Sequence, residues 1–285
     1  PRTTFGIFFA NRLIVPQPSD SAYTVIMSQL LNTDEFSNDS QFRINRGTAD
    51  RLIGFTPYLE NQLLVFFRNS IHLINNVAVT SAAAVFEITR QRGCVARKSI
   101  AASGPQIYFL SDDGVFTLQQ GLDPAKGLGV AISKVSGEAI PLTRPIQDQF
   151  KDVNFAAAEK ACGIVFDNKY FLAVATGSST DNNKVLVYDI LNEAWVSVDS
   201  FPSGFVIDDF VTVLHGSNPQ RRRLFRGPKK RYCDSERVGC VATGLRFRLM
   251  SLRGDRVSDT SAWKRLRMDS TPGGKLRNGN ICISQ

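Results

Sequence analysis

Apolar residues in the first 225 positions of the chain fall into short runs rather than into the stripes of amphipathic helices. The runs are rich in β-branched and aromatic side chains and are bounded by turn-forming residues, a pattern typical of β-strands. They cover residues 12–15, 23–27, 63–67, 71–74, 107–110, 115–118, 164–166, 170–174, 185–188 and 195–198. The pattern therefore predicts a mainly β chain.

Several neighbouring runs are separated by polar turns short enough to form hairpins. The clearest pair flanks Asp113-Gly114, and an Asp-Gly pair supplies the positive φ that a tight hairpin turn needs. A second pair flanks Arg68-Asn69-Ser70, and residues 170–198 contain three runs in succession. We expect two hairpins and one three-stranded antiparallel meander.

These units recur along the chain, beginning near residues 12, 63, 107 and 170. A recurrence of roughly 40–50 residues with about four short strands per unit is typical of β-propeller blades. The fold class that we predict is a partial β-propeller of antiparallel blades, with a large β-sandwich as the alternative. Residues 155–162 (FAAAEKAC) fit either two helical turns or a loop that leads into a strand.

Charge divides the chain into two parts. The net charge of +8 would suggest a nucleic-acid binder, but residues 1–220 hold 17 Lys and Arg against 21 Asp and Glu, a net charge of −4. Residues 221–285 hold 17 against 5, a net charge of +12. We therefore expect a mildly acidic β-propeller-like body over residues 1–225, incomplete as a propeller, and an irregular basic tail over residues 226–285.

Histidine and cysteine offer little for a metal site or for nucleophilic catalysis. His72 lies inside an apolar run, where a solvent-facing or hydrogen-bonded side chain is expected, and His215 is the only other histidine. A zinc site would need three or four convergent ligands. Cys94 and Cys162 are single residues that we expect to be small buried side chains, and Cys233 and Cys240 lack the second ligand pair of a zinc finger.

We expect the remaining motifs to form turns rather than metal-binding or nucleotide-binding sites. Asp112-Asp113-Gly114 and Thr180-Asp181-Asn182-Asn183 lack the spacing of a calcium loop, and Gly127-Leu128-Gly129 lacks the third glycine of a nucleotide-binding turn. Carboxylates in the body are scattered singly, which gives no support to a propeller glycosidase. The sequence therefore predicts no catalytic residue, no cofactor site and no metal site.

The order of the segments is the feature that carries a resemblance. The segments are FANRLIV (9–15), IMSQLLNTDEF (26–36), SQFRINRGTADRLIGFTPYLENQLLVFFRNSIHLI (40–74), SGPQIYFLSDDGVFTL (103–118) and NKYFLAVATGSSTDNNKVLVYDILNEAWVSVD (168–199). This succession of strands and polar turns resembles the β-propeller tail hub or nozzle proteins of short-tailed bacteriophages, related in type to packaged-DNA stabilisation proteins. It covers about residues 9–225.

The resemblance implies a structural, non-enzymatic role in the virion tail, after synthesis in the host cytoplasm. Such proteins form rings that prolong the portal channel, retain the packaged genome and later conduct it out. Implied partners are copies of the chain in a ring, adaptor or portal proteins, tail fibre or tailspike proteins, and passing double-stranded DNA. Two departures, only three to four blades and a first residue Pro1 in place of Met, lead us to expect a fragment.

The acidic balance of the body suits a channel through which DNA slides. Each phosphate that a protein neutralises releases counterions and adds affinity, so a neutral or mildly negative lumen would not grip the duplex. Ordinary surface charge that favours solubility is the alternative explanation. No apolar run approaches the roughly 20 residues of a membrane helix, so we expect no membrane insertion.

Three interpretations of the basic tail remain open. It is a basic arm that binds nucleic acid or a virion partner, a solvated tail with no role, or a stretch translated out of frame. For the first, the candidate nucleic-acid contacts are Arg221, Arg222, Arg223, Lys229, Lys230 and Arg231. Two further functions also remain for the whole chain, a cellular β-propeller interaction scaffold and a propeller enzyme acting on glycans.

Overall fold

The computed structural model describes residues 5–123, 127–132, 134–135, 138–201, 206–214 and 222–227. Side chains are described over 5–119, 140–201 and 206–212 within these ranges. The tail expected over residues 226–285 lies outside the described residues except for the end of one strand. The chain is mainly β, as the sequence predicts.

Four consecutive four-stranded antiparallel sheets make up the body, each in the order in which its strands follow one another along the chain. The first contains β1 (Ile7–Phe9), β2 (Arg12–Pro16), β3 (Thr24–Gln29) and β4 (Asn32–Arg43), and the second β5 (Leu52–Tyr58), β6 (Gln62–Phe67), β7 (Ile71–Asn75) and β8 (Ala84–Thr89). The third contains β9 (Ala101–Ser103), β10 (Gln106–Ser111), β11 (Gly114–Asp123) and β12 (Gly127–Ile132), and the fourth β15 (Cys162–Phe166), β16 (Lys169–Val174), β17 (Lys184–Asp189) and β18 (Ala194–Ser200).

A two-stranded sheet follows the fourth one, made of β19 (Asp209–Leu214) and β20 (Arg222–Gly227). β20 thus extends past Phe225, where we expect strand-like sequence to end. The long connection between the third and fourth sheets holds the small hairpin β13 (Lys134–Val135) and β14 (Glu138–Ala139), then η3 (Arg144–Ile146), α1 (Gln147–Phe150) and η4 (Phe155–Lys160). The remaining short helices are η1 (Thr80–Ala82) and η2 (Arg97–Ser99).

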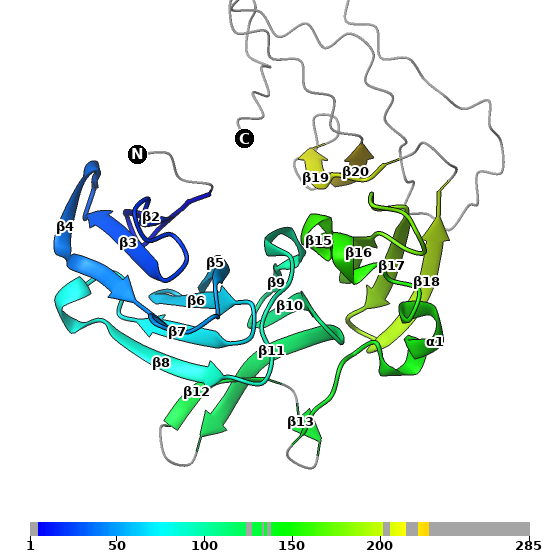
Figure 1. The fold of residues 1–285 in the computed structure, drawn as a ribbon, viewed down its shortest axis with the longest axis horizontal. Helices are drawn as coiled ribbons and strands as arrows, with labels where there is room; N and C mark the ends of the chain where they lie inside the picture. The colour runs from blue at the N-terminus through cyan, green and yellow to red at the C-terminus, as the bar shows by residue number, and fades with distance from the viewer. Residues whose placement is uncertain are drawn as a thin grey trace, which may run out of the picture.

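The sheets follow one another around an arc, with β5, β9, β15 and β19 toward its concave side and β4, β8, β12 and β18 toward its convex side (Figure 1). Contacts between first strands, β9 with β15 and β15 with β19, run along the concave side. Meander sheets that radiate in this way are the blades of a partial β-propeller.

Each of the four hydrophobic clusters lies between two successive sheets. In β6, Leu63, Val65 and Phe67 pack toward the first sheet, whereas Leu64 and Phe66 pack toward the third. β10, β16 and β17 divide their residues between two clusters in the same alternating way. Because a middle strand is buried on both faces, its sequence is a continuous apolar run, and this two-sided burial differs from the one-sided burial of a two-sheet sandwich.

The hairpins and the meander that the sequence predicts are confirmed. β6 pairs with β7, β10 pairs with β11, and β16, β17 and β18 form the meander. Residues 155–160 form the 3-10 helix η4. Asn154 is its N-cap residue, and the Asn154 side chain accepts a hydrogen bond from the Ala156 backbone N–H. Gly114 is needed for close packing, since a Cβ there would lie 2.4 Å from Pro141 Cβ.

Trp195 ties the fourth sheet to the long connection that precedes it. Its Nε1 donates a hydrogen bond to the Leu142 carbonyl at 2.7 Å, and its ring makes an edge contact with Tyr188 at a centroid distance of 5.1 Å. The side chain is only partly buried. It is therefore a cross-link between chain segments more than a fully enclosed core residue.

Trp195→Ala should lower the free energy of unfolding by about 2–4 kcal/mol, because both the ring contact and the hydrogen bond are lost. Trp195→Phe retains an aromatic ring and should cost about 1 kcal/mol. Val196→Ala, at a neighbouring residue that is 50% exposed, is the matched control, with an expected change within about 0.5 kcal/mol. Urea unfolding followed by circular dichroism measures all three, and a loss below about 1 kcal/mol for Trp195→Ala would contradict the assignment.

Candidate functional site

Connections between strands divide into two faces of the propeller. Because each sheet is a four-stranded meander, the chain enters every sheet from the same side. We call one of them the loop face; it is formed by residues 17–23, 44–51, 68–70, 90–100, 112–113, 140–161, 175–183 and 206–208. We call the opposite one the turn face; it is formed by residues 10–11, 30–31, 59–61, 76–83, 104–105, 167–168 and 190–193.

Ion pairs join neighbouring segments of the loop face. Arg68 and Asp112, from the second and third sheets, lie 2.5 Å apart, and Arg92 and Asp113 lie 2.9 Å apart. Further pairs join Arg51 to Glu159, Lys98 to Asp209 and Lys160 to Asp181. Partly exposed pairs of this kind contribute about 0–1 kcal/mol each, so their main effect is to neutralise charge locally.

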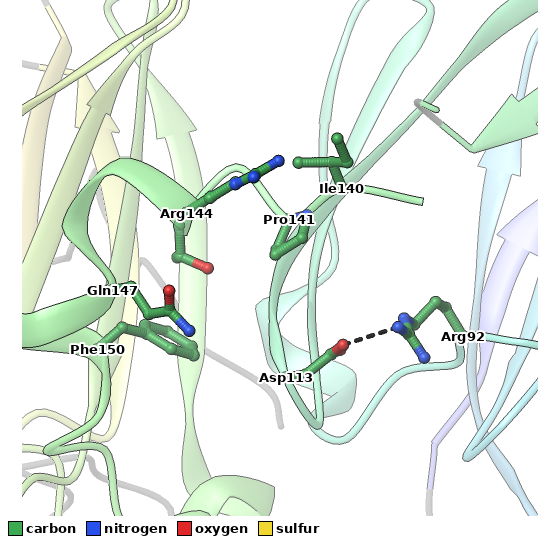
Figure 2. A pocket seen from close by; sticks show the side chains of 8 residues that line it. Arg92, Asp113, Ile140, Pro141, Arg144, Gln147 and Phe150 are labelled. Carbon is green, nitrogen blue, oxygen red and sulfur yellow. Dashed lines mark ion pairs between the residues drawn. The ribbon is translucent and has the colours of Figure 1, made fainter. Parts of the chain in front are cut away.

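A pocket of about 280 Å³ opens on the loop face between the third sheet and the long connection (Figure 2). Arg92 and Asp113 form its ion pair, and Arg144 and Gln147 line the opposite side. The remaining lining residues are Ile140, Pro141, Thr143 and Phe150. Two guanidinium groups suit a small anion or a carboxylate side chain, but the pocket offers neither a nucleophile paired with a base nor a set of metal ligands.

The Arg92 guanidinium makes further contacts besides its ion pair with Asp113. Its guanidinium carbon lies 5.7 Å from the centre of the Phe116 ring, and its Nη1 donates to the Gln91 carbonyl at 2.9 Å. Its buried Nε has no hydrogen-bond partner among the described residues. Arg92 therefore serves the packing between the third sheet and the loop before it.

The prediction that His72 is a hydrogen-bonded strand histidine is confirmed. It is 4% exposed, with Nε2 at 3.1 Å from Asn45 Nδ2 and 3.2 Å from Ser70 Oγ. Ser70 donates in turn to Asp50 Oδ2 at 2.6 Å. Since Asn45 Nδ2 can only donate, Nε2 accepts and the imidazole is neutral. Burial lowers the pKa of His72, opposed by the charges of Glu87 and Asp50.

Both cysteines of the described body are buried free thiols, as expected. Cys94 Sγ donates to the Ala96 carbonyl at 3.1 Å, and Cys162 Sγ points to the Ile207 carbonyl at 3.9 Å. Burial raises the pKa of each thiol to about 12. A thiol that stays protonated at neutral pH is a poor nucleophile, so neither residue is set up for covalent chemistry.

The predicted turn motifs are also confirmed as structural. Asp112 and Asp113 form the turn between β10 and β11 and are held by Arg68 and Arg92. In the loop after β16, Asn182 Nδ2 donates to the Lys160 and Ile207 carbonyls at 2.8 and 2.7 Å. Residues 127–129 lie inside strand β12, which removes the strand–turn–helix context that nucleotide binding would need.

The first strands of the five sheets contain almost no charged residues. The first strands β1, β5, β9, β15 and β19 read IFF, LIGFTPY, AAS, CGIVF and DFVTVL, so they contain Asp209 and no Lys or Arg. Of the candidate nucleic-acid contacts, Arg222 and Arg223 belong to β20, while Arg221, Lys229, Lys230 and Arg231 lie outside the described residues. Those contacts stay a prediction.

Within the described ranges, no cluster of three or more His, Cys, Asp or Glu side chains is arranged to hold a metal ion. The helices of the same ranges are all too short or too polar to cross a membrane. Sequence reasoning missed the ion pairs of the loop face, because Arg51 and Glu159 are far apart in the chain and nothing local marks them as partners.

Comparison with known proteins assigns no family to the chain. No protein-family model matches the chain, and no curated protein matches it. Among solved structures, it is similar to the extracellular domain of a hybrid two-component system and to that of a one-component system, both from B. thetaiotaomicron. Each has 12% identity and a TM-score of 0.44, and each match covers 79% of this chain but 25% of the other. The chain thus spans about a quarter of those structures.

His72 should make stability depend on pH below about 6.5, the ordinary pKa of histidine. The unfolded chain takes up a proton near pH 6.5, whereas the folded chain, with its lowered pKa, does so only at lower pH. The free energy of unfolding should therefore fall as pH drops through about 6.5, and the fall should be smaller in His72→Gln.

Urea unfolding of His72→Gln and of the control His215→Gln at several pH values tests this expectation. His215→Gln leaves the buried imidazole in place and should keep the pH dependence of the parent chain. An unchanged pH dependence in His72→Gln would show that the folded and unfolded states bind the same number of protons at this residue.

Cys94 and Cys162 should resist iodoacetamide at pH 8 in the folded chain, because burial keeps both thiols protonated and inaccessible. Peptide mass spectrometry resolves them from the other three cysteines. Both should be labelled completely after unfolding in guanidinium chloride, and rapid native labelling of either one would contradict the structure.

Proposed function

We propose that the chain is a structural subunit of the tail nozzle or hub of a short-tailed bacteriophage. In this role it assembles with copies of itself into a ring and with adaptor, portal, fibre or tailspike proteins around the channel for double-stranded DNA. Its role is structural rather than catalytic, and it acts in the virion tail.

One observation carries the proposal more than any other: the two buried thiols, His72 and a pair of adjacent loop-face carboxylates all have partners within the chain. Cys94 and Cys162 are buried thiols with raised pKa values, and His72 is neutral within a hydrogen-bond network. Asp112 and Asp113, the adjacent carboxylates of the loop face, are each paired with an arginine. Side chains that serve packing and local charge neutralisation suit a structural subunit of an assembly.

Charge on the described surface is also compatible with a DNA conduit. Arg51, Arg68, Arg92, Lys98 and Lys160 on the loop face are already paired with carboxylates. The first strands contain no Lys or Arg. Cations that are neutralised within the chain release fewer counterions on meeting phosphate, which favours sliding over gripping.

The second candidate is a β-propeller interaction scaffold. Exposed leucines in tight turns favour it, notably Leu31 at 77% exposure and Leu191 at 74%, because isolated apolar tips suit contact with another protein. A scaffold would bind its partner as a single copy. The nozzle proposal instead requires self-assembly, so the two candidates differ in their state in solution.

Electron microscopy of the purified full chain tests the choice directly. The nozzle proposal predicts closed rings with a central opening wide enough for a DNA duplex. A single-copy particle at all concentrations, confirmed by light scattering, would contradict it and favour the scaffold.

A further inference from the structure

Four exposed apolar side chains lie in the turns on the turn face of the first two sheets. They are Leu30, Leu31, Leu59 and Val79, with exposures of 51, 77, 48 and 54%. They are named here the apolar turn cluster. None of these four side chains belongs to the hydrophobic clusters between the sheets.

Hydrogen bonds join the turns of this cluster into one surface. The Leu31 N–H donates to the Asn11 carbonyl at 2.9 Å, which links the two turns of the first sheet. Arg12, which is 8% exposed, donates through Nη2 to the Ala78 carbonyl at 3.0 Å and so reaches the second sheet. The Ala78 N–H donates to Asn61 Oδ1 at 2.7 Å. The cluster is therefore held as a preformed surface that spans both sheets.

Two of the leucines combine an unfavourable backbone conformation with an exposed side chain. Leu31 and Leu59 have φ angles of 60° and 48°, a left-handed conformation that Gly or Asn adopts at lower cost. Both side chains also point into solvent, where a polar residue would be more soluble. Strain and exposure at the same positions indicate a surface kept for contact with another molecule.

The rim of the cluster is acidic. Asp34 and Glu35 follow Leu31 in β4, Glu60 follows Leu59, and all three are exposed. The described turns of the turn face contain no Lys or Arg. Such a rim repels nucleic acid and anionic lipid, and it also opposes contact between two identical clusters, which would bring like charges together.

A complementary basic element lies at the other end of the same chain. β20 reads RRLFRG and so carries Arg222, Arg223 and Arg226. β19 and β20 close one end of the arc, and the first sheet stands at the opposite end (Figure 1). An acidic, apolar surface at one end and a basic strand at the other suit head-to-tail contact between copies.

We propose that the apolar turn cluster docks against the β19–β20 end of a second copy, which brings its acidic rim to a strand of basic sequence. The contact is heterologous, and repetition of a heterologous contact produces a ring when the rotation closes. This inference rests on the self-assembly in the proposed function and names the surfaces that carry it. It also gives Arg222 and Arg223 a protein partner in place of DNA.

Sedimentation velocity of the full chain over a range of concentrations tests the docking surface. Leu30→Asn with Leu31→Asn should raise the dissociation constant for self-association about thirtyfold or more, as expected for central interface residues. Asn tolerates the left-handed φ at position 31, so the variant should keep its melting temperature. Leu191→Asn, which removes an exposed leucine from the turn face of the fourth sheet, is the control and should associate as the parent chain does.

Three outcomes would overturn the inference, and they differ in their meaning. If the parent chain self-associates and the double variant does so equally well, the docking surface is wrong while the ring proposal stands. If the parent chain is a single particle at every concentration, both fail. Equal weakening by Leu191→Asn would also contradict the assignment to the first two sheets.

Charge-reversal variants test whether the β19–β20 end of a second copy covers the apolar turn cluster. Asp34→Lys with Glu35→Lys, and separately Arg222→Glu with Arg223→Glu, should each weaken self-association. Mixing the two variants should restore it, because the reversed charges then face each other across one contact in each pair. Failure of the mixture to associate beyond either variant alone would show that another surface covers the cluster.

Discussion

Burial of the middle strands on both faces is the constraint on which the rest of the structure depends. Phe66 packs toward the third sheet while its neighbours Val65 and Phe67 pack toward the first, and the same alternation recurs in β10, β16 and β17. Removing one sheet would expose an apolar face on the next, so each blade stabilises its neighbours. Polar groups are consequently displaced to the ends of the strands, where the two faces of the propeller lie.

The two faces use those strand ends differently. On the loop face, pairs such as Arg68–Asp112 and Arg92–Asp113 join segments from successive sheets and neutralise each other. On the turn face, backbone and side-chain hydrogen bonds, including those of the buried Arg12, hold tight turns whose leucines remain exposed. The first face consolidates the fold and the second presents a surface, which is compatible with the proposed role in assembly.

Sequence pattern was sufficient for the middle strands and insufficient for much else. Apolar runs mark β6, β10 and β16 because two-sided burial leaves only aliphatic and aromatic residues at their interior positions. In contrast, β9 is only Ala101–Ser103 and the long β4 is mostly polar and exposed, so neither has a run to detect. Arg51 meets Glu159 although two four-stranded sheets lie between them in the sequence. Leu30-Leu31 resembles a further core segment until the structure places it in a turn.

Hydrogen–deuterium exchange on the folded chain tests the central claim, two-sided burial of the middle strands, most directly. Amides of β6, β10, β16 and β17 should exchange slowest and with similar protection, because each lies between two packed sheets. The outer strands β4 and β18 should exchange much faster. Protection confined to one pair of sheets, with fast exchange in the middle strands of the others, would contradict an arc of mutually buried blades.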